Sequence, residues 1–251
     1  MYAIFVTGTA GSGKSLLTSR LIEWYSHNNA YAVPLNLDPG AVNLPYDPVI
    51  DVRNYIDVDT IMQSYGLGPN GALVMASDMI ATKLNEIQNE VEEVNPDYLI
   101  VDTPGQLELF AYRASGPFFT SNLLCENKAV IFLFDGMLVS SPANFISIAL
   151  LATSIRLRLR MSQVNILSKI DIMKDKNKVL AWSSSTSFLE KAISDEEEGE
   201  NYLLSMALLK SVLKTGFSIG LIAVSGATGE GMMDLGAVLG RILTRGEEVE
   251  D

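Results

Sequence analysis

The residues from Gly8 to Ser15 read Gly-Thr-Ala-Gly-Ser-Gly-Lys-Ser, which fits the spacing G-x-x-x-x-G-K-[ST] of a phosphate-binding loop. The apolar run before them predicts a buried strand, and the apolar residues after them recur at helical spacing. Glycines let backbone N–H groups turn toward a phosphate, and the N-terminus of the following helix adds a favourable dipole. A plain glycine-rich turn is the alternative, but the strand–loop–helix context favours phosphate binding.

The side chains of this loop have separate expected roles. Lys14 would reach the β- and γ-phosphates, and the Ser15 hydroxyl would bind Mg²⁺. The expected phosphate-binding residues are Gly11, Ser12, Gly13, Lys14, Ser15 and Leu16. The sequence therefore predicts a nucleotide-binding protein.

A second strand end carries a carboxylate. The run Tyr98–Asp102 ends in an acid and continues Thr-Pro-Gly-Gln. Asp102 is expected to hold Mg²⁺ directly or through water, and the Gly105 N–H to approach the γ-phosphate. Gln106 could orient the attacking water. An ordinary strand-to-turn transition is the alternative, which an independent phosphate loop in the same chain disfavours.

A third strand end predicts selection of guanine. The run Gln163–Ser168 continues Lys-Ile-Asp, so that it ends in Ser-Lys-x-Asp. Guanine offers N1–H and a 2-amino group to the Asp171 carboxylate, whereas adenine would leave that carboxylate unpaired at a cost of several kcal/mol. Lys169 would lay its aliphatic stem along the base. Ser168 is a shortened version of the Asn or Thr that guanine-nucleotide proteins usually have here.

Two further strand ends could contribute to the same edge of the sheet, because open α/β sheets bind ligands at the carboxyl ends of their strands. Asp38 follows a predicted strand and could point at the metal or at the hydrolytic water. A simple Asp turn before proline is the alternative. Ser225 and Ala227 flank a turn that could place a backbone N–H near guanine O6, or could be a plain strand-to-loop turn.

These loops need a sheet to position them, and the chain alternates short apolar runs with helical patterns. The predicted strands are Tyr2–Thr7, Tyr31–Leu37, Tyr98–Asp102, Ala129–Asp135, Gln163–Ser168 and Ile219–Ser225. The predicted helices are Ser15–His27, Met75–Val94, Pro142–Arg160 and Gly231–Leu243. We expect a single α/β domain over residues 1–251: a doubly wound, mostly parallel sheet of the P-loop NTPase type, with a helical insertion at about 174–217.

Composition limits the partners. The chain has 30 acidic and 18 basic residues among 251, a net charge of −12, which disfavours direct binding to nucleic acid or to an anionic membrane. The acidic segments Asp195–Glu200 and Gly246–Asp251 are expected to be solvated. Its one cysteine fits a cytoplasmic location. The N-terminus enters a strand at once and no apolar run reaches about 18 residues, so neither a signal peptide nor a membrane span is expected.

Taken in order, the motifs resemble those of GPN-loop GTPases, and the length is that of an archaeal-type member. The matching segments are Asn36–Pro39, Asp51–Arg53, Gly68–Gly71, Asp102–Gln106 and Ser168–Asp171. The resemblance implies a homodimer in which each subunit extends its Gly-Pro-Asn loop, residues 68–70, into the active site of its partner. Asn70 would there stabilise the transferring phosphoryl group. Without the resemblance, Gly68–Gly71 is simply a turn.

The resulting hypothesis is a homodimeric, Mg²⁺-dependent GTPase that hydrolyses GTP to GDP and phosphate by in-line attack of water, and whose nucleotide state switches the conformation of the dimer. Asp38 and Gln106 would position the water, and Arg53 is interpreted as a structural ion-pair partner. The resemblance also implies a protein client related to RNA polymerase. Two alternatives stay open: a small-molecule or nucleoside kinase, which would need an arginine-bearing lid that residues 174–217 do not supply, and a non-enzymatic, nucleotide-gated scaffold.

Overall fold

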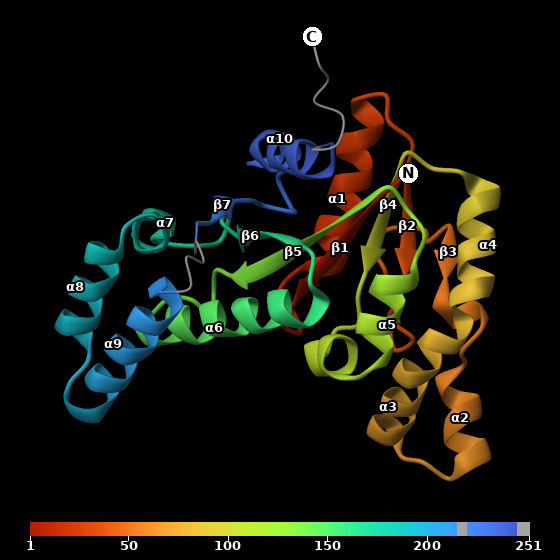
Figure 1. The fold of residues 1–251 in the computed structure, drawn as a ribbon, viewed down its shortest axis with the longest axis horizontal. Coiled ribbons are helices and arrows are strands. Elements are labelled where there is room, and N and C mark those ends of the chain that lie inside the picture. Colours follow the sequence, from red (N-terminus) through yellow and green to blue (C-terminus); the bar gives the residue numbers. More distant parts are fainter. Residues whose placement is uncertain (215–219, 245–251) are drawn as a thin grey trace.

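A seven-stranded sheet organises the chain, in the order β3-β2-β4-β1-β5-β6-β7 (Figure 1). The computed structural model describes residues 1–214 and 220–244, and every strand pairing within them is parallel. The strands are β1 Tyr2–Gly8, β2 Ala32–Asn36, β3 Ile50–Asp51, β4 Tyr98–Asp102, β5 Asn127–Asp135, β6 Ser162–Ser168 and β7 Ile222–Ala223. The strand β1 lies between β4 and β5, so the loop that follows it leaves from the middle of the sheet.

Helices cover both faces of this sheet, as the doubly wound prediction requires. They are α1 Lys14–His27, α2 Val58–Tyr65, α3 Pro69–Met79, α4 Leu84–Val94, α5 Ser115–Asn122, α6 Pro142–Leu159, α7 Lys176–Ser184, α8 Thr186–Glu196, α9 Gly199–Lys214 and α10 Met232–Leu243. Short 3₁₀ segments span Val52–Asn54 and Ile80–Lys83, and a π-helical segment spans Glu108–Tyr112. The predicted fold class is confirmed.

Alternate residues of each strand belong to different cores, because successive strand side chains point to opposite faces. In β1, Ile4 and Val6 pack in the cluster that contains α1 and α10. Ala3 and Phe5 belong to the larger cluster, which contains residues of α3 to α6. Figure 1 shows α1 and α10 on one side of the sheet and α6 on the other. Burial on both faces explains why these strands are apolar throughout.

The prediction of one continuous helix over Met75–Val94 is wrong. The segment is divided among the end of α3, the 3₁₀ turn Ile80–Lys83 and α4. The Thr82 hydroxyl donates to the Met79 carbonyl at 2.6 Å, and such a local bond competes with the α-helical ladder. The helices α2 and α5 and the two-residue strand β3 were not predicted.

Three helices, α7 to α9, occupy most of the segment in which the helical insertion was predicted, and Figure 1 shows them grouped beyond α6. Trp182 of α7 packs edge-on against Phe145 of α6, with ring centroids 5.9 Å apart. Residues 215–217 of the predicted insertion, residue 219 of the predicted last strand and the acidic tail 246–251 lie outside the described residues. The last strand is shorter than predicted, because only Ile222–Ala223 pair with β6. Within residues 1–214 and 220–244, no helix has both the length and the apolar character of a membrane span.

Candidate nucleotide-binding site

The loop between β1 and α1 has the backbone that its glycines predict. Gly13 caps α1 with φ +96°, a left-handed conformation that favours glycine. A Cβ added to Gly8 would lie 2.8 Å from the Ser12 Oγ, so the loop is also closely packed. Ser12 itself is fully buried, with a hydroxyl that has no hydrogen-bond partner. The loop is therefore a tight turn that continues directly into the N-terminus of α1, a helix of 14 residues. A glycine-rich turn before a helix N-terminus is the arrangement that binds phosphate.

Lys14 folds back over this loop. Its Nζ donates to the carbonyl oxygens of Gly8 at 3.1 Å and Thr9 at 3.0 Å, and reaches that of Gly105 at 3.4 Å. The side chain is buried, and burial lowers its pKa while the charge of Asp102 opposes that change. Neutral carbonyls are weaker partners for an ammonium group than phosphate oxygens are, so a bound phosphate can take their place.

The Asp102 carboxylate lies at the end of β4 and is only 1% exposed. The Tyr46 hydroxyl donates to its Oδ2 at 2.9 Å, whereas Oδ1 is buried without a hydrogen-bond partner. Burial raises the pKa of Asp102 to about 6, although the nearby Ser15 and Tyr46 hydroxyls favour the charged form. The pKa of Tyr46 lies far above its usual value because of burial and then of the Asp102 charge.

These oxygen donors fit a magnesium ion. Mg²⁺ prefers oxygen ligands and typically keeps several waters and substrate phosphates, so it needs few protein groups. The orphaned Oδ1 of Asp102 and the Ser15 hydroxyl at the start of α1 supply such groups beside the phosphate loop. The residues predicted to serve the metal, Ser15 and Asp102, are therefore brought together.

Asp38, the third predicted metal or water residue, joins the loops that follow β2 and β4. Its Oδ2 accepts a hydrogen bond from the Gly105 amide at 2.9 Å, and its Oδ1 accepts one from the Gly40 amide at 2.9 Å. Asn36 fixes the start of this turn by accepting from the Asp38 amide at 3.0 Å. Gln106 follows Gly105 and is exposed, so its side chain is accessible at the rim of the site.

Arg53 acts as the predicted ion-pair partner. Its Nη2 lies 2.6 Å from Oδ2 of Asp51, and its Nε lies 3.0 Å from each carboxylate oxygen. The Asn36 amide also donates to Asp51, at 2.9 Å. Hydrogen bonds from Arg53 and Asn36 lower the pKa of Asp51 against the effect of burial, which is the largest influence and acts to raise it. The ion pair of Asp51 and Arg53 thus holds Asn36, the residue that in turn accepts from the Asp38 amide.

The predicted base-binding residues surround a cavity of about 200 Å³ next to the phosphate loop. Its lining includes the predicted residues Ser12, Gly13, Leu16, Ser168, Lys169, Asp171 and Ala227. Ser225 lies just behind Asp171 and donates its hydroxyl to Oδ1 of that carboxylate at 2.6 Å. The sequence motifs at the ends of β6 and β7 therefore meet in one cavity.

Ser168, the departure from the usual motif, has a structural role that a short side chain can fill. Its hydroxyl donates to the carbonyl of Ser12 at 3.0 Å and to that of Phe134 at 3.2 Å. It therefore connects the base-binding loop to the phosphate loop. Lys169 has φ +59° and forms an ion pair with Asp135 at 2.8 Å, which fixes the direction of its aliphatic stem.

Asn70 is not brought into this site by its own chain. It is exposed in the first turn of α3, where Gly68 is the N-cap and Pro69 the first helical residue, so the expected loop is in fact a helix start. Proline suits that position because its missing N–H would have no helical partner there. Figure 1 shows the turn between α2 and α3 well apart from the carboxyl end of β1.

Two other residues at the site were not predicted from the sequence. Tyr46 contacts Asp102 across 56 positions of the chain. Arg20, from α1, clamps the turn after β7 by donating to the carbonyls of Gly226 at 3.1 Å and Ala227 at 2.9 Å. Neither residue belongs to a local motif, so only the three-dimensional fold identifies them.

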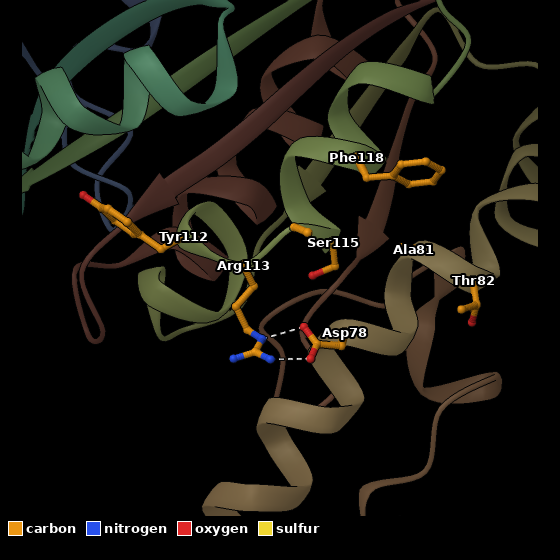
Figure 2. A pocket seen from close by; sticks show the side chains of 8 residues that line it. Asp78, Ala81, Thr82, Tyr112, Arg113, Ser115 and Phe118 are labelled. Atoms are coloured by element: carbon orange, nitrogen blue, oxygen red, sulfur yellow. Dashed lines mark hydrogen bonds and ion pairs between the residues drawn. The ribbon is translucent and has the colours of Figure 1, made fainter.

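A separate open cavity of about 700 Å³ lies among the Ile80–Lys83 turn, the π-helical segment and α5 (Figure 2). Arg113, just after the π-helical segment, forms a two-bond ion pair with Asp78 of α3, and its Nε lies 2.5 Å from Oδ1. The chain that begins at Gly105 and Gln106 is thus attached to the helix whose first turn carries Asn70.

Comparison with known proteins agrees with the site. Residues 6–245 match a family model described as "Conserved hypothetical ATP binding protein". The GPN-loop GTPase PAB0955 of Pyrococcus abyssi is 37% identical over 180 residues, which cover 71% of each protein. The chain belongs to the GPN-loop GTPase family. As a family member it also matches GPN-loop GTPase 1 of Dictyostelium discoideum, with 33% identity over 89% of this chain, and it spans 58% of that relative's length.

The fold agrees with this membership. The crystal structure of PAB0955, described as a GTPase in apo form, superposes with a TM-score of 0.85 at 29% identity. The match covers 96% of this GPN-loop chain and 97% of the other, so the arrangement of sheet, helices and insertion is shared almost throughout.

Proposed function

We propose that this protein is a Mg²⁺-dependent GTPase that hydrolyses GTP to GDP and phosphate and works as a homodimer. The observation that carries the proposal is the meeting of four predicted groups at one edge of the sheet: Lys14, Asp102, and Asp38 bonded to Gly105. A phosphate-binding ammonium group, a metal-binding oxygen, an amide donor for the terminal phosphate and a carboxylate for the nucleophile are parts that phosphoryl transfer to water requires.

Each part has a defined task in that reaction. The amides of the phosphate loop and Lys14 would bind the phosphates, while Ser15 and Asp102 would hold Mg²⁺, which neutralises charge on the phosphate oxygens when bound. The Gly105 amide would donate to the terminal phosphate. Asp38 and Gln106 would orient the water for in-line attack, and most of the acceleration would come from this positioning and from electrostatics.

Guanine is the proposed base. Asp171 lines the cavity and receives a hydrogen bond on Oδ1 from Ser225, which restricts the rotation of the carboxylate. A fixed carboxylate can accept from the N1–H and 2-amino groups of guanine, and adenine cannot satisfy it. The matching family model is described as ATP-binding, so competition between ATP and GTP is the direct test, and GTP should bind more tightly.

The dimer supplies what a single chain lacks. Asn70 is exposed in the first turn of α3 and lies apart from its own phosphate loop, which supports the proposal that it enters the site of a second subunit. In that site its side-chain amide would donate to the transferring phosphoryl group, a task for which no other uncommitted donor was predicted.

Mixing two inactive variants tests the whole proposal. Lys14→Ala should abolish phosphate binding in its own subunit, and Asn70→Ala should impair only the site of the partner. Each variant alone should be nearly inactive, whereas an equimolar mixture should regain about a quarter of wild-type turnover, because half of randomly formed dimers contain one complete site. Lack of any recovery in a mixture shown to exchange subunits would refute sharing of the site.

Product analysis separates the alternatives. Equal amounts of GDP and inorganic phosphate, with no phosphorylated acceptor, would exclude a kinase. Nucleotide binding without measurable turnover would instead indicate a nucleotide-gated scaffold.

Assembly of a larger complex such as RNA polymerase stays a prediction. Binding of the purified polymerase, measured with GDP and with a non-hydrolysable GTP analogue, should differ between the two nucleotide states if the prediction holds.

A further inference from the structure

Tyr46 reaches the buried acid of the site from a segment with no predicted function. It lies between β2 and β3, and its hydroxyl donates to Oδ2 of Asp102 at 2.9 Å. The side chain is half-buried, and Tyr46 belongs to none of the motifs that predict nucleotide binding. The Tyr46 hydroxyl therefore donates to Asp102, the carboxylate proposed to hold the metal.

The segment that carries Tyr46 is held at two other points. The Ser19 hydroxyl, on α1, donates to the Pro45 carbonyl at 3.2 Å. Arg53 donates through Nη1 to the Ala41 carbonyl at 2.8 Å. The residue immediately before Tyr46 is thus bonded to α1, the helix whose first turn holds Ser15, so the segment that carries the tyrosine is attached to the element that carries the Ser15 hydroxyl.

The contact makes the two oxygens of Asp102 different. Oδ2 accepts a hydrogen bond from Tyr46, whereas Oδ1 is buried without a hydrogen-bond partner of its own, although the Ser15 hydroxyl lies near enough to favour the charged carboxylate. The terminal torsion of an aspartate is broad and roughly two-fold, so a single fixed donor can decide which oxygen faces which group. With Tyr46 in place, Oδ1 is the oxygen left to face the metal.

We propose that Tyr46 is a positioning residue for the magnesium site, which holds Asp102 so that Oδ1 is presented to the ion or to its bound water. This inference rests on the proposed function and adds to it a residue that the phosphate-binding motifs do not include. Donors behind metal-binding carboxylates typically change metal affinity 10–100-fold when removed.

Tyr46→Phe tests the inference, because phenylalanine keeps the ring and removes only the hydroxyl. The readout is the affinity for a fluorescent GDP analogue, titrated with Mg²⁺ and repeated in EDTA. We expect the half-saturating Mg²⁺ concentration to rise about 10-fold, with the affinity in EDTA changed less than about 2-fold. Ser19→Ala removes the bond that holds the Pro45 carbonyl but leaves the Tyr46 hydroxyl in the protein. This variant should shift the Mg²⁺ midpoint in the same direction by a smaller amount.

Tyr55→Phe is the matched control, because the Tyr55 hydroxyl interacts with Glu90 and not with Asp102. It should leave the Mg²⁺ midpoint unchanged. A wild-type midpoint in Tyr46→Phe, with an unchanged thermal unfolding curve, would overturn the inference, and so would a lower midpoint, which would make the tyrosine a competitor of the metal. If the wild-type protein itself takes up no Mg²⁺–GDP, the proposed function fails instead.

Discussion

The Asp38 carboxylate accepts a hydrogen bond from the Gly105 amide at 2.9 Å, across 67 positions of the sequence. The same amide is the donor expected to meet the terminal phosphate of GTP. A carboxylate oxygen therefore stands where a phosphate oxygen would be bound. Under the proposed function, the terminal phosphate would displace Asp38 from this amide, and Asp38 would then be free to act on the hydrolytic water.

Asp38→Asn should accordingly separate binding from chemistry. Loss of the charge removes repulsion of the terminal phosphate, so affinity for GTP relative to GDP should rise about 3- to 10-fold, which corresponds to about 1 kcal/mol. Turnover should fall at least about 100-fold, because the water loses its carboxylate. Single-turnover hydrolysis and competitive nucleotide binding measure the two effects. Asp47→Asn, an exposed carboxylate in the same connection between β2 and β3, is the control. An unchanged ratio of GTP affinity to GDP affinity in Asp38→Asn would show that Asp38 does not compete with phosphate.

Gln106→Ala should lower turnover while it spares GTP affinity. The side chain is exposed at the rim and follows the Gly105 amide, so it can orient water without contributing to nucleotide binding. A fall of about 10²-fold in kcat is expected for loss of a positioning group. Since Glu108 is also exposed nearby, Glu108→Ala serves as the comparison and should have little effect. A variant with full kcat would remove Gln106 from the mechanism.

Asp171→Asn should shift the preference from guanine toward xanthine nucleotides. The amide can donate to the extra carbonyl of xanthine but no longer accepts from two guanine donors. Competition between GTP and XTP for the fluorescent analogue measures the change, and we expect selectivity to move by at least about 10-fold. Ser225→Ala should weaken GTP binding less, because it removes only the donor that fixes Asp171. Retained GTP selectivity in Asp171→Asn would contradict the base assignment.

The central strands and the phosphate loop could be predicted because their signals are contiguous. The run before Gly8 is apolar on both faces, and the loop residues follow in a fixed spacing. The base-binding cavity was also predictable, since Asp171 and Ser225 both stand at ends of parallel strands, which meet at one edge. The strands, the phosphate loop and the base-binding cavity were therefore predictable from local sequence patterns and from the rule that ligands bind at the carboxyl ends of parallel strands.

Other parts depend on contacts between distant residues. The pairing of Tyr46 with Asp102 joins segments that only the order of β2, β4 and β1 brings together. The strand β3 has two residues, too few for a periodic pattern. At the break after α3 the Thr82 hydroxyl bonds to the Met79 carbonyl, whereas the apolar spacing of Met75–Val94 continues through it and hides the break from a reading of the pattern.

Acidity should change the stability of the nucleotide-free protein through Asp102. Burial raises its pKa from 3.8 to about 6, so the folded chain holds a proton that the unfolded chain releases between these values. The stabilisation is complete below pH 3.8 and is lost as the pH rises through 6. By linkage, this one group makes the chain less stable at pH 7.5 than at pH 3.8 by about 3 kcal/mol.

Asp102→Asn isolates that effect, because the amide is similar in shape and carries no charge to bury. In EDTA, the variant should be more stable than the wild type at pH 7.5, and the difference should shrink by about half between pH 7.5 and pH 5. Urea unfolding at a series of pH values measures it. Mg²⁺ with GDP should reverse the order, since the metal compensates the buried carboxylate only in the wild type. A stability difference that is constant from pH 7.5 to 5 would mean that the carboxylate is already ionised throughout this range in the folded chain.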